Sequence, residues 1–144
     1  MTRSSLDQWL QQLASLHPTE IELGLDRVRA VAETLQLLPW SIPAITIAGT
    51  NGKGSVAATC EAALVALDIP VGVYTSPHLV SYNERIRIGQ VPAGDASICA
   101  AFAAIDAARG DVPLTYFEFG TLAAFWLFAQ RSVDALVLEV GLGG

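Results

Sequence analysis

The sequence has 144 residues, of which 52% are hydrophobic and 15% are charged, and its formal net charge is −6 at pH 7. This length suits one domain with its own core. The acidic balance argues against nucleic acid or an anionic membrane as the partner, because both attract basic surfaces. The N-terminus is too polar for a signal peptide, and no apolar stretch is long enough to span a bilayer. We therefore expect a cytoplasmic domain.

The first forty residues predict two leading helices. Ser5 and Gln8 fit a capping box, and apolar residues recur at helical spacing behind them. The turn His17-Pro18-Thr19 is expected to break this helix. A second helix is predicted from about Leu25 to Leu38, with Pro39 ending it.

Strands and helices alternate along the rest of the chain. Strands are predicted at residues 44–48, 71–74 and 135–140, and helices at 54–67, 94–108 and 117–130. The helix 54–67 is apolar nearly all round, so we expect it to be buried. Its Cys60, and Cys99 in the next helix, are predicted to be buried reduced thiols. This order indicates an α/β fold with three layers around a parallel sheet.

The sole lysine of the sequence, Lys53, lies in a glycine-rich loop that joins a strand to a helix. Glycines let backbone N–H groups approach an oxyanion, and the helix N-terminus adds positive partial charge. The spacing differs from the standard phosphate-binding loop, because Gly54 stands between Lys53 and Ser55. A tight turn would need only the glycines, so we predict a polyphosphate site. Its residues are Gly49, Thr50, Asn51, Gly52, Lys53, Gly54 and Ser55.

Glu139 ends the last predicted strand, at the edge where open α/β sheets bind their ligands. A carboxylate there can hold Mg²⁺ together with substrate phosphates. Alternatively, Glu139 caps backbone N–H groups of the glycines that follow it. The nucleotide implied by the loop favours the metal interpretation.

Two further segments carry polar side chains at the ends of elements. Thr75-Ser76-Pro77-His78 follows the second strand, where Ser76 could bind the metal and His78 an anion, although a Ser-Pro turn is usually only a turn. Thr115-Tyr116-Phe117-Glu118 precedes an apolar helix. An aromatic side chain beside a carboxylate suits a flat heterocycle. The spacing alone favours the alternative, a helix capping box.

Together these segments resemble the Mur ligase superfamily and, within it, the folylpolyglutamate synthase/dihydrofolate synthase (FolC) type. The similarity rests on five blocks in the family order: Ile21–Val28, Ala48–Ser55, Thr75–Leu79 with Asn83–Ile86, Tyr116–Glu118, and Leu138–Gly144. Gly54 after the lysine favours the folate branch over the peptidoglycan branch. The resemblance implies a truncated P-loop domain of the Mur ligase type. Residues 1–144 would be its N-terminal part, without the C-terminal glutamate ligase domain.

The resemblance also implies site residues and ligands. Asn51 to Gly54 would bind ATP phosphates, Lys53 and Glu139 would be catalytic, and Ser76, Glu139 and Ser55 would hold Mg²⁺. The pterin substrate would contact two groups of residues beside the loop that begins at Ser76. These substrate residues are Ile21, Glu22, Leu23, Ser76, Pro77, His78, Arg85, Thr115, Tyr116, Phe117 and Glu118.

The implied activity is the ATP-dependent addition of L-glutamate to dihydropteroate or to folate polyglutamates, through an acyl phosphate. The implied parent is a monomer, and exposed apolar surface could make the isolated chain self-associate. Because members of the family are much longer than this chain, we expect the chain alone to be an inactive fragment. Two alternatives stay open, namely another Mur-type amino acid ligase and a non-catalytic nucleotide- and pterin-binding fragment.

Overall fold

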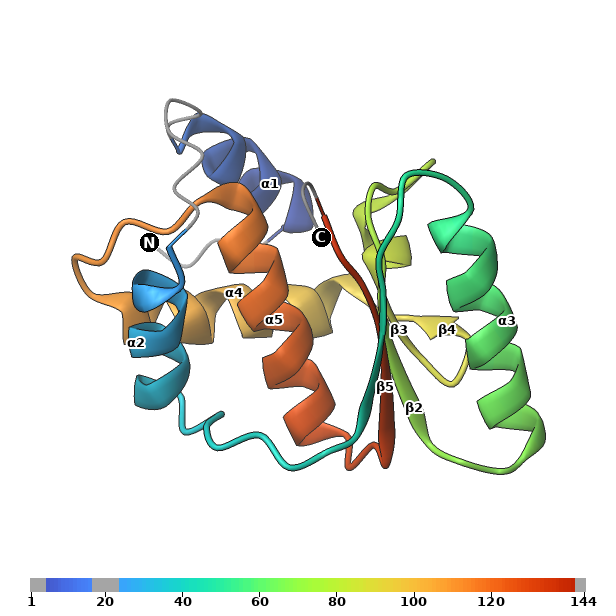
Figure 1. Cartoon of the computed structure of the whole chain (residues 1–144). Coiled ribbons are helices and arrows are strands. Elements are labelled where there is room, and N and C mark those ends of the chain that lie inside the picture. Colours follow the sequence, from blue (N-terminus) through green and yellow to red (C-terminus); the bar gives the residue numbers. More distant parts are fainter. Residues whose placement is uncertain (1–4, 17–23, 142–144) are drawn as a thin grey trace. The chain divides into compact units, whose positions relative to one another are not determined.

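The computed structural model describes residues 5–16 and 24–141, and the chain divides into two compact units (Figure 1). Unit 1 comprises residues 1–40 and 95–127, and unit 2 comprises residues 41–94 and 128–144. Unit 2 contains the sheet and the glycine loop, whereas unit 1 is helical. The predicted phosphate-binding residues therefore all belong to unit 2, and Thr115–Glu118 belongs to unit 1.

Unit 2 is built on a five-stranded sheet with the order β1-β5-β2-β3-β4. Strand β5 lies between β1 and β2 and is parallel to both, as the alternation of strands and helices predicts. Strands β3 and β4 are antiparallel to their neighbours, so the sheet is mixed, and the predicted parallel part consists of β1, β5 and β2. The connection after β2 is short, and a parallel return needs a longer crossover. The strands are β1 (Ala44–Ile47), β2 (Val71–Tyr74), β3 (Ile86–Ile88), β4 (Val91–Pro92) and β5 (Ala135–Glu139).

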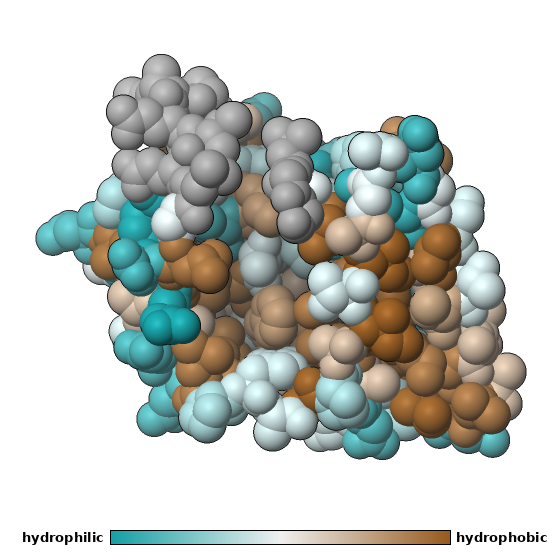
Figure 2. Space-filling view, in the orientation of Figure 1, coloured by the Kyte–Doolittle hydropathy of each residue, from teal (hydrophilic) through white to brown (hydrophobic). Residues whose placement is uncertain are grey.

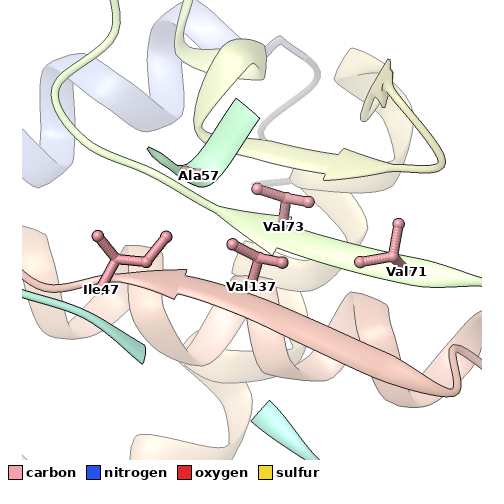
Figure 3. Packing of buried hydrophobic residues seen from close by; sticks show 5 residues of the cluster. All are labelled: Ile47, Ala57, Val71, Val73 and Val137. Atoms are coloured by element: carbon pink, nitrogen blue, oxygen red, sulfur yellow. The ribbon is translucent and has the colours of Figure 1, made fainter. Parts of the chain in front are cut away.

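The core of unit 2 forms between the sheet and one face of helix α3 (Lys53–Ala66). Figure 3 shows branched side chains of three strands gathered beneath Ala57 of the helix. β-branched residues fit the pleated surface of a sheet, and the small Ala57 lets the helix approach it closely. The cluster consists of Ile47, Ala57, Val71, Val73 and Val137.

Helix α3 is not buried all round, contrary to the expectation from its composition. Ala57 and Glu61 are its buried residues, whereas Val56 is 49% exposed. A helix that covers one face of a sheet buries only the side that faces the strands, whatever its other side is made of. Cys60 and Cys99 are free thiols as predicted, but both are only half-buried, so the prediction that they are buried is wrong.

Unit 1 consists of helices α1 (Leu6–Ser15), α2 (Asp26–Thr34), α4 (Asp95–Arg109) and most of α5 (Tyr116–Gln130). Aromatic rings connect three of them. The ring of Phe102 on α4 lies 5.8 Å from that of Trp9 on α1 and 6.1 Å from that of Phe119 on α5, between centroids. Tilted and edge-to-face arrangements of this kind are the favourable ones for aromatic pairs. These rings form the centre of the unit's core.

The ends of the leading helices only partly match the prediction. The Ser5 side chain accepts a hydrogen bond of 3.3 Å from the backbone N–H of Gln8, which confirms the cap of α1. Helix α2 ends at Thr34 rather than Leu38, because Gln36 adopts a left-handed φ of 58°. The N–H of Leu37 then bonds the Ala32 carbonyl at 2.9 Å, as in a Schellman motif. The predicted break at residues 17–19 lies outside the described residues.

Exposed apolar side chains occur on β1 and at the end of α3. Ile45 on β1 is 44% exposed, and Leu67, the C-cap of α3, is 68% exposed. Figure 2 shows apolar surface gathered over this part of unit 2. Self-association through this surface stays a prediction. In residues 5–16 and 24–141, no helix combines the length and the apolar character needed to cross a membrane.

Candidate nucleotide-binding site

The carboxyl ends of the three parallel strands meet at one edge of the sheet. Ile47 at the end of β1 is paired in register with Glu139 of β5. Tyr74 at the end of β2 is paired with Leu138 of the same strand. The glycine loop follows β1, and Ser76 lies two residues beyond Tyr74. The expectation that β5 lies near the glycine-loop strand is therefore confirmed, and three of the predicted segments share one edge.

The backbone conformation of the loop requires glycine at two positions. Gly49 has φ +146° and Gly52 has φ +75°, values that residues with a side chain rarely adopt. Gly54 differs, because it lies in the first turn of α3 with no positive φ and no heavy atom within 4 Å of the place of a Cβ. Neither conformation nor packing among the described residues requires glycine there. A ligand that approaches the backbone closely at this position would explain why the residue is glycine.

Lys53 begins helix α3, where backbone N–H groups have no intrahelical partner and favour an anion. Its ammonium donates a hydrogen bond of 3.4 Å to the backbone carbonyl of Val140. Val140 directly follows Glu139, so the lysine head group is held next to the predicted metal ligand. Lysine, glycine loop and carboxylate thus belong to one cluster at the edge of the sheet.

The side chain of Glu139 is the unusual member of this cluster. Glu139 is 8% exposed, and its carboxylate makes no hydrogen bond or ion pair with a residue in the described ranges. A carboxylate at this edge that no protein cation neutralises is free to bind a metal ion. The alternative, a cap on the following glycines, has no hydrogen bond from the N–H of Gly141 to Glu139, and Gly143 and Gly144 lie outside the described residues.

The donor atoms at this edge fit a magnesium ion that is shared with phosphates. No group of three or more His, Cys, Asp and Glu residues in the described part of the chain could hold a metal by itself. Magnesium, however, usually binds through one or two carboxylates, waters and substrate phosphates. The Glu139 carboxylate with the hydroxyl of Ser76 or Ser55 matches that set. These ligands remain predictions.

The segment after β2 folds back on itself and ends in the short helix η1 (Tyr82–Arg85). Within it, Nε of Arg85 donates a hydrogen bond of 2.8 Å to Nδ1 of His78. An accepting Nδ1 means that the neutral ring carries its proton on Nε2. His78 can therefore donate from Nε2 to an anion, which is the role predicted for it.

Glu84 organises the tip of this segment, and the sequence reasoning missed it. Its carboxylate accepts hydrogen bonds from the backbone N–H groups of Leu79 (2.9 Å), Val80 (2.8 Å) and Ser81 (2.7 Å). The N–H groups of Leu79, Ser81 and Val80 hold the pKa of Glu84 below its ordinary value of 4.5. The signal was present in the sequence, because Ser81 followed three residues later by Glu84 is a capping box.

In unit 1, Thr115 and Glu118 form the capping box that their spacing favours. The backbone N–H of Thr115 bonds Oε2 of Glu118 at 2.8 Å, and the Glu118 N–H bonds the Thr115 hydroxyl at 3.2 Å. The other carboxylate oxygen pairs with Arg27 at 3.0 Å, a contact that the sequence did not predict. Phe117 is 41% exposed. Contact of this block with a pterin stays a prediction, and Ile21, Glu22 and Leu23 lie outside the described residues.

Unit 1 also contains an apolar pocket of about 280 Å³. Its walls come from α2, from Leu37 to Trp40, and from α5, and Arg29 is its one charged residue among those described. The indole N–H of Trp40 is buried there without a hydrogen-bond partner among the described residues. A pocket of this composition is not a polyphosphate site.

The fold and the edge cluster define the class of protein. A mixed α/β sheet with a glycine loop after β1 and a carboxylate at the end of the neighbouring strand is a nucleotide-binding domain of the Mur ligase type. Solved structures of FolC proteins share it. A structure of Escherichia coli FolC in complex with DHPP and ADP matches 100% of this chain with a TM-score of 0.94 and 49% identity. One from Yersinia pestis with AMPPNP and a manganese ion also matches 100% of the chain, with a TM-score of 0.94 and 52% identity.

Sequence comparison identifies the particular relatives. The dihydrofolate synthase/folylpolyglutamate synthase of Escherichia coli strain K12 is 50% identical over 141 residues, which are 98% of this chain and 33% of that protein. The protein of the same description from Haemophilus influenzae is 48% identical over 98% of this chain. No family model matches the chain. The resemblance to the folylpolyglutamate synthase/dihydrofolate synthase type is confirmed, and the chain spans about a third of the length of these curated relatives.

Proposed function

We propose that this chain supplies the nucleotide-binding part of an ATP-dependent ligase that adds L-glutamate to dihydropteroate and to folate polyglutamates. One observation carries the proposal. The glycine loop with Lys53 and the unpaired carboxylate of Glu139 lie at the ends of two directly paired parallel strands. The ligands of solved relatives support it, because structures of this type contain ADP, AMPPNP with manganese, and L-glutamate.

In the proposed reaction, a carboxylate oxygen of the pterin substrate attacks the γ-phosphorus of ATP, and the bond to the bridging oxygen of ADP breaks. The glutamate amine then attacks the acyl carbon, phosphate leaves, and an amide forms with loss of the amine proton. Such phosphoryl transfer depends mainly on positioning and charge neutralisation. The protein's contribution is therefore the placement of donors around the phosphates.

Each edge residue has a defined part in this scheme. The backbone N–H groups from Asn51 to Gly54 bind phosphate oxygens. Lys53 leaves the Val140 carbonyl, where its hydrogen bond is long at 3.4 Å, and neutralises the β- and γ-phosphates. Glu139 and Ser76 hold the magnesium ion, which when bound withdraws charge from the bridging phosphate oxygens. Ser55 offers a further hydroxyl close to the loop.

The substrate is proposed to contact two groups of residues. In unit 2 these are Ser76, Pro77, His78 and Arg85. In unit 1 they are Thr115 to Glu118, where the capping box fixes the backbone and Phe117 is 41% exposed. Residues 21–23 are proposed to contact the substrate as well, on the basis of the family resemblance alone. The glutamate site is proposed to lie in a further part of the protein, beyond the residues of unit 1 and unit 2.

A substrate comparison tests this function against another Mur-type ligase. In the intact protein, we expect ADP production that needs both L-glutamate and a pterin acid, either dihydropteroate or tetrahydrofolate. ADP production with a UDP-linked sugar acid and no response to either pterin would contradict the folate assignment. The same assay with the chain of residues 1–144 tests whether the chain alone is inactive. We expect no ligation from it, and pterin-dependent turnover would refute the fragment interpretation.

A further inference from the structure

A buried ion pair lies behind the edge cluster, between helix α3 and strand β3. Nε of Arg87 contacts both carboxylate oxygens of Glu61 at 3.2 and 3.1 Å, and Nη2 contacts Oε2 at 2.9 Å. The Glu61 side chain is 5% exposed and that of Arg87 is 20% exposed. Buried pairs of this kind are weak contributors to stability, because desolvation offsets their attraction. Their geometry is the more informative property.

The free side of the same guanidinium holds the base of the segment 76–84. Nη1 of Arg87 donates to the Thr75 hydroxyl at 3.2 Å and to the backbone carbonyl of Glu84 at 2.9 Å. Thr75 directly precedes the segment, and Glu84 is its last residue, so one side chain joins both ends. A further hydrogen bond of 2.9 Å, from the Thr75 N–H to the Arg85 carbonyl, closes the same base.

The rest of the segment depends on Glu84. Its carboxylate is the acceptor for the three N–H groups of residues 79–81, so a shift of its backbone would move the whole tip. Contacts therefore run in series from Glu61 on the phosphate-binding helix to Arg87, and from there to both ends of the segment. Only an arginine has the planar fork of donors that can serve a carboxylate on one side and two oxygens on the other.

We infer that Arg87, oriented by Glu61, is a positioning residue that fixes segment 76–84 against helix α3. This inference deepens the proposed function, on which its catalytic consequence rests. The segment begins with Ser76, a predicted metal ligand, and includes His78, a predicted anion donor. Helix α3 starts at Lys53, which is proposed to bind phosphate. The Glu61–Arg87 pair therefore fixes the position of Ser76 and His78 relative to Lys53.

The decisive variant replaces the pair without leaving a buried charge. In the double variant Glu61→Leu/Arg87→Met, apolar packing replaces the ion pair, so we expect thermal stability near that of the wild type. The contacts of Nη1 with Thr75 and Glu84 are nevertheless lost. Amide hydrogen exchange of residues 79–81 is then expected to rise at least tenfold. Should the double variant fail to fold, Arg87→Lys keeps the charge beside Glu61 but lacks the fork, and the same rise is expected.

A second readout concerns the site itself. In the intact protein, the Arg87 variants are expected to need a severalfold higher Mg²⁺ concentration for half-maximal ATP turnover. Their kcat should fall by roughly 10- to 100-fold, as for catalytic groups displaced by about 1 Å. Affinity for an ATP analogue without metal should not change, because the glycine loop is untouched. Arg109→Met serves as the control, since it removes the Asp106–Arg109 ion pair of unit 1, whose arginine is about as exposed as Arg87.

The two readouts separate the possible failures. Wild-type exchange at residues 79–81 in stable Arg87 variants would overturn the inference, and so would wild-type Mg²⁺ dependence. If the Arg87 variants show raised exchange but the wild-type protein does not ligate glutamate, the proposed function is overturned and the positioning role of Arg87 stands. If the Arg87 variants lose both thermal stability and affinity for the ATP analogue without metal, the Glu61–Arg87 pair has a structural role only, and the inference is overturned.

Discussion

The ammonium of Lys53 donates a hydrogen bond of 3.4 Å to the carbonyl of Val140, the residue that follows Glu139. This contact joins the start of helix α3 to the residue just after strand β5. The lysine head group is thereby held at the residue that follows the predicted metal ligand. An arriving nucleotide has only to displace one long hydrogen bond to bring the lysine onto its phosphates.

Loss of the Lys53 ammonium should weaken nucleotide binding. For Lys53→Met we expect a loss of roughly 10- to 100-fold in affinity for an ATP analogue, since hydrogen bonds to charged groups contribute about 1.5–3 kcal/mol. Isothermal titration calorimetry measures this. Arg29→Met, which removes an exposed positive charge from α2, is the matched control and should bind as the wild type does. Equal affinities of the two variants would show that Lys53 does not meet the phosphates.

Glu139→Gln should separate metal binding from folding. The variant keeps the shape of the side chain and breaks no hydrogen bond or ion pair in the described ranges, so we expect the unfolding temperature to change little. The increase in ATP-analogue affinity that Mg²⁺ produces should disappear, while affinity without metal is kept. Asp134→Asn, an exposed carboxylate just before the same strand, is the control. A lower unfolding temperature with intact Mg²⁺ dependence would instead support the capping interpretation of Glu139.

The order of residues 79–81 should depend on pH through Glu84. Its pKa is lowered in the folded protein, so the ionised carboxylate stabilises the loop above the ordinary value of 4.5, and this contribution is lost as the pH falls through the lowered pKa. Protection factors of the three amides should therefore be constant near neutral pH and fall below about pH 4.5. Glu84→Gln should remove both the protection and its pH dependence, whereas Glu33→Gln on α2 should change neither.

Gly72 should not tolerate a side chain. A Cβ on Gly72 in β2 would lie 2.5 to 2.9 Å from ring atoms of Phe128. We expect Gly72→Ala to lower the free energy of unfolding by about 1–3 kcal/mol, the usual cost of overpacking. Urea denaturation measures this. Gly94→Ala is the matched control because nothing lies within 4 Å of its Cβ position. Phe128→Leu in the Gly72→Ala background should recover part of the loss, and strict additivity of the two changes would argue against the clash.

The partly exposed ring of Phe117 should contribute to pterin binding. We expect Phe117→Ala to reduce affinity for dihydropteroate by up to about tenfold, in line with an aromatic pair worth about 0.5–1.5 kcal/mol. Fluorescence titration measures this, and ATP-analogue affinity should be unchanged. Leu25→Ala, which truncates another exposed apolar side chain of unit 1, is the control. A Phe117 variant with undiminished pterin affinity would leave the Thr115–Glu118 block as a capping box only.

Local patterns were sufficient to predict the edge of the sheet. The strand Val71–Tyr74 and the positions of Lys53 and Glu139 follow from apolar runs interrupted by glycine and polar residues. The early end of α2 was missed because a left-handed glutamine has no strong sequence signal. The Glu61–Arg87 pair was missed for another reason. It exists only because β3 returns antiparallel to β2 and places Arg87 opposite helix α3, which is a long-range consequence of the fold.

The most direct test of the central claim is anomalous diffraction from crystals of the protein grown with AMPPNP and Mn²⁺. We expect a manganese peak at about 2.0–2.3 Å from the Glu139 carboxylate and the Ser76 hydroxyl, typical of small divalent ions bound by oxygen. The phosphates should lie on the N–H groups of residues 51–54, with the Lys53 ammonium moved from Val140 to the γ-phosphate. A manganese peak away from Glu139, with Lys53 still bonded to Val140, would contradict the account.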